Sequence, residues 1–391
     1  MSFRKRSLIR PIYAPSLLLN ATEAALLPVL PVSAVSYGLG LAEAGVVVTV
    51  MMVAAMLFEV PASWLTTRLG ERRAMLLATA SATVLLSLAY FNLGYIALVV
   101  AAAGFGCSYA LFGLSRHSLL THLTPPAVRP RAMALLGGMF RGGWALGPII
   151  GSFVIAVFGL QSAYLLAMVL AVASGVIVYS VKAEKLASPP SGQHGNVWAV
   201  AKREAPKLLT LGVASGIISG ARAIRLIGLP LLAVALGIDA ATSSFIFGVT
   251  GLIDFALFYL AGIIMEKYGK FWSSVPTLMM LGVAYLFAFF VTDLASFWIL
   301  AAVTALANAL SAGINMVLGA DLAPEGARSE FLASFRLLTS GGSAFAPALI
   351  SGLTAFAGLP AALAITGLTN FVGAYLFWKY LPIYAPDKSR N

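Results

Sequence analysis

The sequence of 391 residues has few charged side chains and a single cysteine, Cys107. Only 10% of its residues are Asp, Glu, Lys or Arg, whereas 60% are apolar; an ordinary soluble domain has roughly 25% charged residues. A soluble chain of this size cannot bury so much apolar surface in one core. The composition therefore excludes a cytosolic enzyme and a disordered chain, and one cysteine excludes an intrachain disulfide.

The sequence also lacks the short motifs that mark common enzyme sites. It contains no H-E-x-x-H, no G-x-S-x-G, no Walker loop and no C-x-x-C. His117 and His122 are five residues apart and do not share a helix face, so no metal site is expected. We therefore expect neither an enzyme nor a cofactor, and without an ATP site any energy that the protein uses must come from an ion or solute gradient.

Long apolar stretches recur along the whole chain, and each is about long enough to cross a bilayer core of roughly 30 Å as a helix. Strands of membrane barrels alternate apolar and polar residues, and these stretches do not. We therefore predict an all-α membrane protein. Its twelve spans are expected at about 12–36, 44–66, 73–92, 95–121, 131–156, 160–181, 208–234, 241–264, 272–291, 295–320, 328–354 and 359–381. The first run is too long for a signal peptide, so we expect an uncleaved helix.

The basic residues lie on one side of this topology. With the N-terminus inside, the predicted inner segments hold 20 of the 25 Lys and Arg residues, and the six outer loops hold none. The outer loops instead carry Glu43, Asp239 and Asp293. The positive-inside rule then places both termini in the cytoplasm, for a multi-pass protein of the plasma (inner) membrane. The net charge of +11 therefore reflects the orientation of the spans in the membrane. Because it does not indicate a nucleic-acid-binding surface, no nucleic-acid partner is expected.

Residues 199 positions apart resemble each other over most of the chain. The matching pairs include Gly70 and Gly269, Pro125 and Pro324, Gly143 and Gly342, and Pro148 and Pro347. One ungapped offset predicts two six-helix bundles in a parallel repeat, as transporters use around an axis along the membrane normal. The predicted parts are an N-terminal bundle at 1–182, a polar cytoplasmic linker at 183–206 and a C-terminal bundle at 207–391.

Two inner loops resemble a motif of the major facilitator superfamily. The loop after the second span reads Ser63-Trp-Leu-Thr-Thr67-Arg68-Leu-Gly70-Glu71-Arg72-Arg73, which is similar to the family's G-x-L-A-D-R-x-G-R-R. Its counterpart in the second half reads Gly262-Ile-Ile-Met-Glu266-Lys267-Tyr-Gly269-Lys270. In the family, the acid and the arginine of this loop latch the two halves on the inner side. The acid position is Thr67 here in the first half, which departs from the family. The resemblance implies gating roles for Arg68, Gly70, Arg72, Glu266, Lys267 and Gly269.

The fifth span is similar to an element of the family's drug:proton antiporter branch. It reads Gly143-Trp-Ala-Leu-Gly147-Pro148-Ile-Ile-Gly151, against G-x-x-x-G-P-x-x-G in that branch. Small residues four apart let helices pack closely, and the proline bends the helix. The resemblance implies that Gly143, Gly147, Pro148 and Gly151 act in gating. The branch's usual arginine in the fourth span is missing, because Ala101 stands about where it should be.

Polar residues inside the spans are costly and normally face a wet cavity or a partner. The first span carries Ser16, Asn20 and Glu23 at spacings of four and three, hence on one helix face. The matching residues of the seventh span are Ser215, Ser219, Arg222 and, one turn further, Arg225. Both spans line the central cavity in the resembled family, which implies that Glu23 and Arg222 face that cavity from opposite halves.

Glu23 is the first candidate for a proton-titrating group. It lies about 11 residues into its span, or ~16 Å deep at 1.5 Å per residue. Competition between proton and substrate for its carboxylate would couple the two fluxes. The alternative is a fixed ion pair of Glu23 with Arg222 or Arg141 that holds the halves together. Asp254 is the second candidate, whereas Glu59 is expected to snorkel or to pair toward the inner side.

The fourth span presents Tyr109, Phe112 and Arg116 on one face, with Asn308, Ser311 and Asn315 at the matching places of the tenth. An aromatic stripe is usually packing, but beside an arginine it could also hold an apolar or planar substrate by stacking. The predicted substrate contacts are Asn20, Glu23, Tyr109, Phe112, Arg141, Ser219, Arg222, Arg225, Asn308 and Arg336.

These observations predict a secondary active transporter that moves a small amphipathic solute by alternating access, as proton-coupled export. The spans contain five arginines but only three acids, so their interior is electropositive. This favours an anionic or zwitterionic substrate. Two alternatives stay open: a flippase for lipid or glycolipid head groups, and a membrane sensor that does not transport. The expected partners are the substrate, protons and membrane lipids, and a monomer suffices in this fold.

Overall fold

The computed structural model describes residues 8–125, 129–181 and 197–386, and the regular structure in these segments is helical throughout. The first half contains a π-helical turn, Ile9–Tyr13, then α1 (Ala14–Leu26), α2 (Val29–Ser36), α3 (Leu41–Leu69), α4 (Glu71–Tyr90), α5 (Tyr95–Leu123), α6 (Arg129–Phe158) and α7 (Ser162–Ser180). The rest contains α8 (Val197–Arg203), α9 (Ala205–Lys207), a second π-helical turn, Leu208–Gly212, α10 (Val213–Ala235), α11 (Ala240–Tyr268), α12 (Lys270–Phe287), a 3₁₀ turn, Ala288–Phe290, α13 (Leu294–Leu310), α14 (Ile314–Leu322), α15 (Arg328–Ala357) and α16 (Leu359–Tyr384).

The helices confirm the predicted fold class, an all-α membrane protein with twelve spans. Eleven helical segments of the described chain are long and apolar enough to cross a membrane. The one predicted span that is not among these eleven is the eleventh in chain order, α15, which has 30 residues and a sequence rich in Gly, Ser and Thr. Predicted and observed bounds agree within a few residues. Two expected helices are interrupted, the first at Leu27-Pro28 and the tenth at 311–313.

The repeat is visible in the bounds of the elements. Helix α3 at 41–69 and α11 at 240–268 are offset by 199 residues, and so are α6 at 129–158 and α15 at 328–357. Gly70 (φ +79°) and Gly269 (φ +93°) occupy the same place in the two halves, each between two long helices. Only glycine adopts such φ values readily, so these two glycines allow the tight turns between the long helices.

The contacts of the chain divide it into two compact units. The first unit contains the chain before residue 190 together with residues 233–255, and the second contains 190–232 and 256–391. The repeat assigns 233–255 to the C-terminal bundle, whereas its contacts group it with the N-terminal one. Gly248 and Gly251 of α11 explain this grouping, because the backbone there lies directly against Ile149 and Trp144 of α6.

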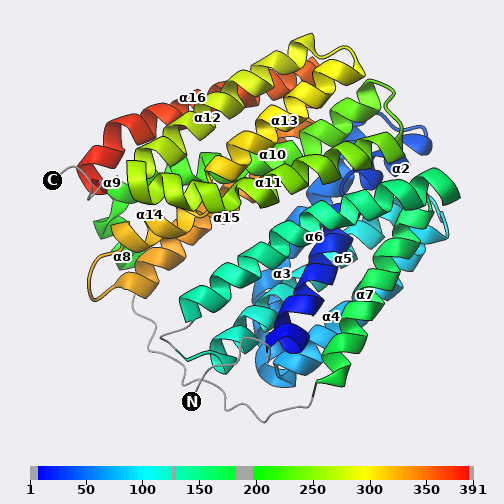
Figure 1. The fold of residues 1–391 in the computed structure, drawn as a ribbon, viewed down its shortest axis with the longest axis horizontal. Coiled ribbons are helices and arrows are strands. Elements are labelled where there is room, and N and C mark those ends of the chain that lie inside the picture. The colour runs from blue at the N-terminus through cyan, green and yellow to red at the C-terminus, as the bar shows by residue number, and fades with distance from the viewer. Residues whose placement is uncertain (1–7, 126–128, 182–196, 387–391) are drawn as a thin grey trace. The chain divides into compact units, whose positions relative to one another are not determined.

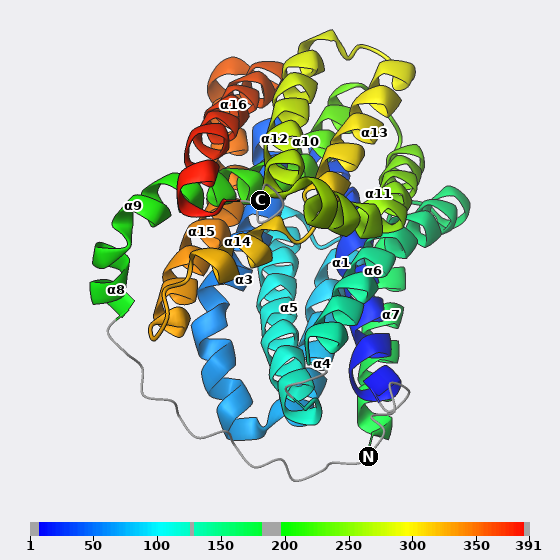
Figure 2. The same ribbon diagram turned by 60° about the vertical axis from the view of Figure 1, so that its left-hand side comes forward.

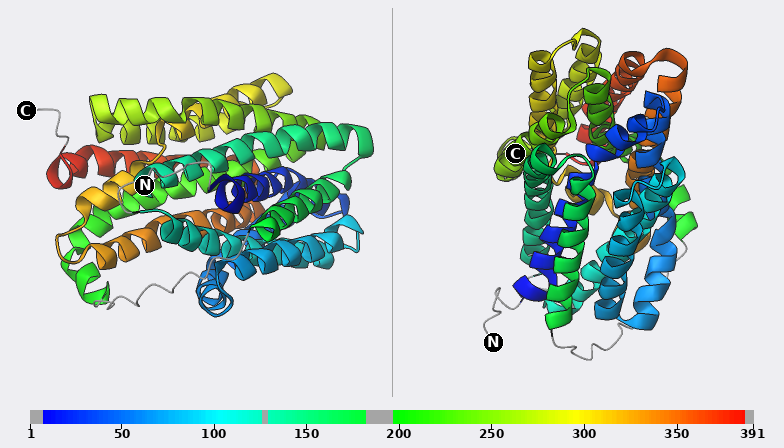
Figure 3. Two further views of the ribbon diagram at one scale, coloured as in Figure 1. Left: turned by 60° about the horizontal axis from the view of Figure 1, so that its bottom comes forward. Right: turned by 90° about the vertical axis from the view of Figure 1, so that its right-hand side faces the viewer.

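In the first unit, α1 lies between α6 and α7, and α5 packs along α3 and α4 (Figures 1 and 3). Small residues make this packing close. A Cβ atom on Gly106 of α5 would lie 2.1 Å from the carbonyl oxygen of Met51 on α3. The backbones of α3 and α5 are therefore in contact, as small residues allow in membrane helices.

In the second unit, α12 packs against α16 and α13 (Figure 2). A buried apolar cluster joins α10, α12, α14, α15 and α16 through residues such as Ile218, Leu278, Leu318, Phe331 and Phe377. In both units large apolar side chains also lie on the surface, as at Val60 (79% exposed) and Phe356 (92% exposed). Such surfaces suit a solvent of lipid tails and are rare on soluble proteins.

Candidate functional site

The polar face predicted on the first span lies inside the first unit. Asn20 on α1 is buried, and its Nδ2 donates a hydrogen bond to the carbonyl oxygen of Ser16 at 2.6 Å. The hydroxyl of Tyr109 on α5 donates to Asn20 Oδ1 at 2.8 Å. The structure therefore brings together two of the predicted substrate residues from helices that are far apart in sequence.

Glu23 lies one turn further along α1 and is partly buried. The indole Nε1–H of Trp144 on α6 donates to its Oε2 at 3.3 Å, and Tyr109 also hydrogen-bonds the carboxylate. Arg116 acts on Glu23 electrostatically, but no ion pair within 4 Å found in the described part of the chain includes Glu23. The groups that hydrogen-bond the carboxylate are thus neutral, and the Trp144 indole is the one that donates while the Tyr109 proton is directed at Asn20.

Arg116 of α5 is 3% exposed and is the deepest cation of this cluster. Its guanidinium carbon lies 4.2 Å from the ring centroid of Phe140 on α6 and 5.7 Å from that of Phe112. Its Nε and Nη1 are buried and have no hydrogen-bond partner. From the sequence we expected Arg116 on the aromatic stripe but did not include it among the substrate contacts. Its position two helical turns after Tyr109, on the same face, could have indicated that it belongs to this site.

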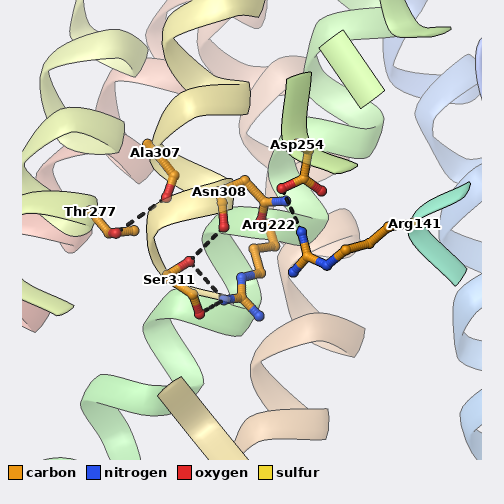
Figure 4. Close-up of polar contacts among 7 residues, drawn as sticks. All are labelled: Arg141, Arg222, Asp254, Thr277, Ala307, Asn308 and Ser311. Carbon is orange, nitrogen blue, oxygen red and sulfur yellow. Dashed lines mark hydrogen bonds and ion pairs between the residues drawn. The ribbon is translucent and has the colours of Figure 1, made fainter. Parts of the chain in front are cut away.

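Arg141 and Asp254 form an ion pair in the same unit. The Nη1–H of Arg141 on α6 donates to Asp254 Oδ1 on α11 at 2.6 Å (Figure 4). Both side chains are mostly buried, at 20% and 13% exposure. The acid that Arg141 neutralises is therefore Asp254, which the sequence analysis treated as a separate proton-titrating candidate.

The glycines of the fifth span pack against α1. A Cβ atom on Gly143 would lie 2.6 Å from the carbonyl oxygen of Leu17, and one on Gly147 would lie 2.2 Å from that of Ala21. Gly151, in contrast, leaves ordinary van der Waals space, with 3.8 Å to the nearest atom. The G-x-x-x-G part of the motif thus joins helices of one unit, and Pro148 lies within α6 one residue later.

The polar residues of the second unit gather around the break between α13 and α14. Arg222 of α10 donates from Nη2 to the carbonyl oxygen of Ser311 at 2.5 Å and to its hydroxyl at 2.7 Å (Figure 4). Asn315 donates from Nδ2 to the Ser219 hydroxyl at 2.9 Å. Gly313 in the left-handed region (φ +80°) interrupts the helix here. The break leaves carbonyl groups that Arg222 can use.

The remaining predicted substrate residues are spread over the second unit. Arg225 is buried on α10, and Asn308 is partly buried on α13, where its carbonyl oxygen accepts from the Ser311 hydroxyl at 3.1 Å. Arg336 lies exposed on α15. Glu59 of the first unit is also exposed, on α3. The structure therefore groups Arg222, Ser219 and Asn308 around Ser311 and Asn315, and it leaves Arg336 at a surface.

The predicted inner-loop residues make contacts within their own units. Arg72 donates from Nη2 to the carbonyl oxygen of Tyr179 at 2.5 Å, at the C-terminal end of α7. The helix dipole stabilises a positive charge at this end of a helix. Arg68 stacks over the ring of Trp64 at 4.1 Å, and the Thr67 hydroxyl donates to the Ser63 carbonyl. In the second unit Glu266 and Lys267 are exposed.

Glu71 makes a contact that the motif did not predict. Its Oε1 lies 2.8 Å from His122 Nδ1 and accepts from the Ser118 hydroxyl at 2.9 Å, so it joins the start of α4 to the end of α5. In the second unit Lys270, at the position that matches Glu71, pairs with Asp321 at 2.7 Å. Among the described residues, each half therefore pairs an acid with a basic side chain at this turn, and the acid and the base have exchanged helices between the halves.

Hydrophobic spans in two repeats with charges in their interior define a multi-pass membrane protein. The family model of the Major Facilitator Superfamily matches residues 16–221 and 211–391, so the chain belongs to that superfamily. This confirms the resemblance at the level of the superfamily and indicates a transporter and not an enzyme. None of the curated proteins compared with the chain matches it.

Solved structures of transporters share this fold. A POT family transporter in complex with a thioalcohol-conjugated peptide has a TM-score of 0.80 at 11% identity and covers 97% of both chains. A D-xylose-proton symporter has a TM-score of 0.75 at 16% identity, over 98% of this chain and 99% of that one. A bacterial homologue of the human lysosomal transporter Spinster, in an inward-facing and occupied conformation, has a TM-score of 0.76 at 13% identity, over 97% of both. At these identities the likeness concerns the fold alone.

Proposed function

We propose that this chain exports a small amphipathic solute in exchange for protons, by alternating access, and that Glu23 is the group that exchanges the proton. The observation that carries the proposal is the environment of Glu23. Its carboxylate lies partly buried among spans, and neutral groups, the Trp144 indole and the Tyr109 hydroxyl, hydrogen-bond it.

These neutral donors allow the proton to bind and leave without the rupture of an ion pair. The Tyr109 hydroxyl has one proton, which it can give to Asn20 or to Glu23, and its oxygen can accept from Glu23 when that carboxyl is protonated. A cationic group of a solute at the Glu23 carboxylate would compete with the proton. Such competition at one carboxylate is what exchange requires.

Asp254 is less suited to this role because Arg141 neutralises it at 2.6 Å. We assign this ion pair to the positioning of residues 240–255 against α6. The loop residues Arg68, Gly70, Arg72, Glu266, Lys267 and Gly269 remain our candidates for gating on the cytoplasmic side, in a monomer of the plasma membrane.

The test begins with purified protein and a thermal-shift screen of amphipathic amines, amino acids and short-chain phospholipids at pH 6 and pH 8. Compounds that stabilise the protein are then tested for flux in vesicles with an imposed pH gradient. We expect Glu23→Gln to bind the compound but to lose flux that depends on the pH gradient. Glu59→Gln, which changes an exposed acid of the same unit, serves as the matched control.

Three outcomes would contradict the proposal. Unchanged gradient-dependent flux in Glu23→Gln would show that the proton binds elsewhere. Stabilisation by phospholipids alone would favour the head-group flippase, and binding without flux in the wild type would favour the sensor.

A further inference from the structure

We infer that Arg116 is the recognition site for an anionic group, a carboxylate, on the transported solute. This deepens the proposed function, since it concerns the same interior of the first unit and names the chemistry of its ligand. Together with an amine at Glu23, it would make the solute an amphipathic zwitterion.

The first observation is the burial of a guanidinium with unused donors. Arg116 is 3% exposed, and its Nε and Nη1 lack hydrogen-bond partners. Nε belongs to one edge of the guanidinium fork and Nη1 to the other, so each edge that could bind a carboxylate retains a free N–H. Buried charged donors are costly to leave unused, and inside a membrane they mark sites of function.

The second observation is the surroundings of this guanidinium. The ring of Phe140 stacks on its face at 4.2 Å and Phe112 lies at 5.7 Å. Stacking fixes the plane of the guanidinium and directs its N–H groups away from the rings. The aromatic rings also supply an apolar wall for the body of an amphipathic ligand. A hydrated inorganic ion would gain nothing from that wall.

The third observation concerns charge. Glu23 and Tyr109 are the groups that act on Arg116 electrostatically. A purely structural Arg116 would serve as a distant counter-charge for Glu23, and in that role it would not distinguish an acid from an amide. This difference makes the two roles separable by experiment.

The test uses two compounds that differ only in the group at issue, N-acetylphenylalanine and its primary amide. Their binding to purified full-length protein is measured by calorimetry at fixed pH and ionic strength. We expect the wild type to bind the acid at least tenfold more tightly than the amide. Arg116→Gln should bind both compounds alike, whereas Arg73→Gln, at an exposed arginine of the first unit, should keep the preference.

Two further variants keep the test decisive if Arg116→Gln does not fold and separate it from the test of the proposed function. If Arg116→Gln does not fold, Arg116→Lys provides the comparison: a point charge without the fork should weaken binding of the acid several-fold and leave the amide unchanged. Glu23→Gln should keep the preference for the acid, because it leaves Arg116 in place. Loss of proton-driven flux in that variant tests the proposed function, whereas loss of the acid preference would count against Arg116.

The inference fails if the wild type binds acid and amide equally, or if the preference survives in both Arg116→Gln and Arg116→Lys. A wild type that prefers the acid but shows no proton-dependent flux would sustain the anion site and refute the proposed exchange.

Discussion

Arg141 on α6 and Asp254 on α11 are 113 residues apart in sequence, and their side chains meet at 2.6 Å. The pair joins residues 240–255 to the first unit, together with the close backbone contacts of Gly248 and Gly251. A segment that belongs to the second half by sequence is therefore held by the first half through one ion pair and two glycines.

We expect Asp254→Asn to lower the free energy of unfolding by roughly 2 kcal/mol or more, because it leaves the mostly buried Arg141 without its charge partner. The exchange of both residues, Arg141→Asp with Asp254→Arg, should recover part of this loss. Thermal unfolding of the purified variants measures both effects. Equal stability of Asp254→Asn and the wild type would show that the pair does not hold this segment.

Gly147 allows α6 to touch α1, and alanine should not fit there. The added Cβ would lie 2.2 Å from the Ala21 carbonyl oxygen, so we expect Gly147→Ala to cost about 1–3 kcal/mol by overpacking. Gly151→Ala, with 3.8 Å of space, is the matched control and should be neutral or slightly stabilising. A neutral Gly147→Ala would contradict the observed contact.

Tyr109 and Tyr37 each donate a hydrogen bond to an asparagine, one inside and one at the surface. Tyr109→Phe leaves Asn20 Oδ1 without a buried donor and should cost about 1–2 kcal/mol. Tyr37→Phe removes the exposed bond to Asn92 and should cost less than about 0.5 kcal/mol. The midpoint of thermal unfolding compares the two; equal effects would mean that the interior at Tyr109 is solvated.

Asp239 directly precedes α11, in a predicted outer loop, and accepts a hydrogen bond from the Thr242 N–H at 2.9 Å. The side chain and the N–H of Thr242 hold the pKa of Asp239 below its usual range. The stabilisation is therefore present above the unfolded-state pKa of about 4 and is lost as pH falls through the lower folded-state value.

At neutral pH, Asp239→Ala should cost about 0.5–1 kcal/mol, the value of a helix N-cap. Asp239→Asn keeps an acceptor for the Thr242 N–H and should preserve most of the stability, without the acid-dependent loss. Unfolding curves between pH 3 and pH 7 provide the measurement, and an identical acid dependence in both variants and the wild type would exclude the cap as its source.

The predicted orientation can be tested by labelling single cysteines. In a Cys107→Ala background, Leu93→Cys lies in a predicted outer loop, and Lys202→Cys lies in the predicted cytoplasmic segment; both positions are exposed. In intact cells an impermeant maleimide should label the first and spare the second. The reverse pattern would overturn the inside location of both termini.

The sequence alone determined the class of this protein, because the length of apolar runs and the distribution of Lys and Arg depend only on the bilayer. It also determined the repeat: the offset of 199 residues that matches Gly70 with Gly269 recurs in the bounds of α3 and α11. Local signals sufficed there, since a glycine turn and a helix end are set by neighbouring residues.

Tertiary structure decided which polar groups meet. Periodicity placed Asn20 and Glu23 on one face, but only packing selected Tyr109 and Trp144 as their partners, paired Arg141 with Asp254 and left two donors of Arg116 unused. Partners of this kind come from helices about 90 to 120 residues away, and their choice depends on how closely α1, α5, α6 and α11 approach. That approach is set by small residues such as Gly143 and Gly147 acting together, which no single segment of sequence specifies.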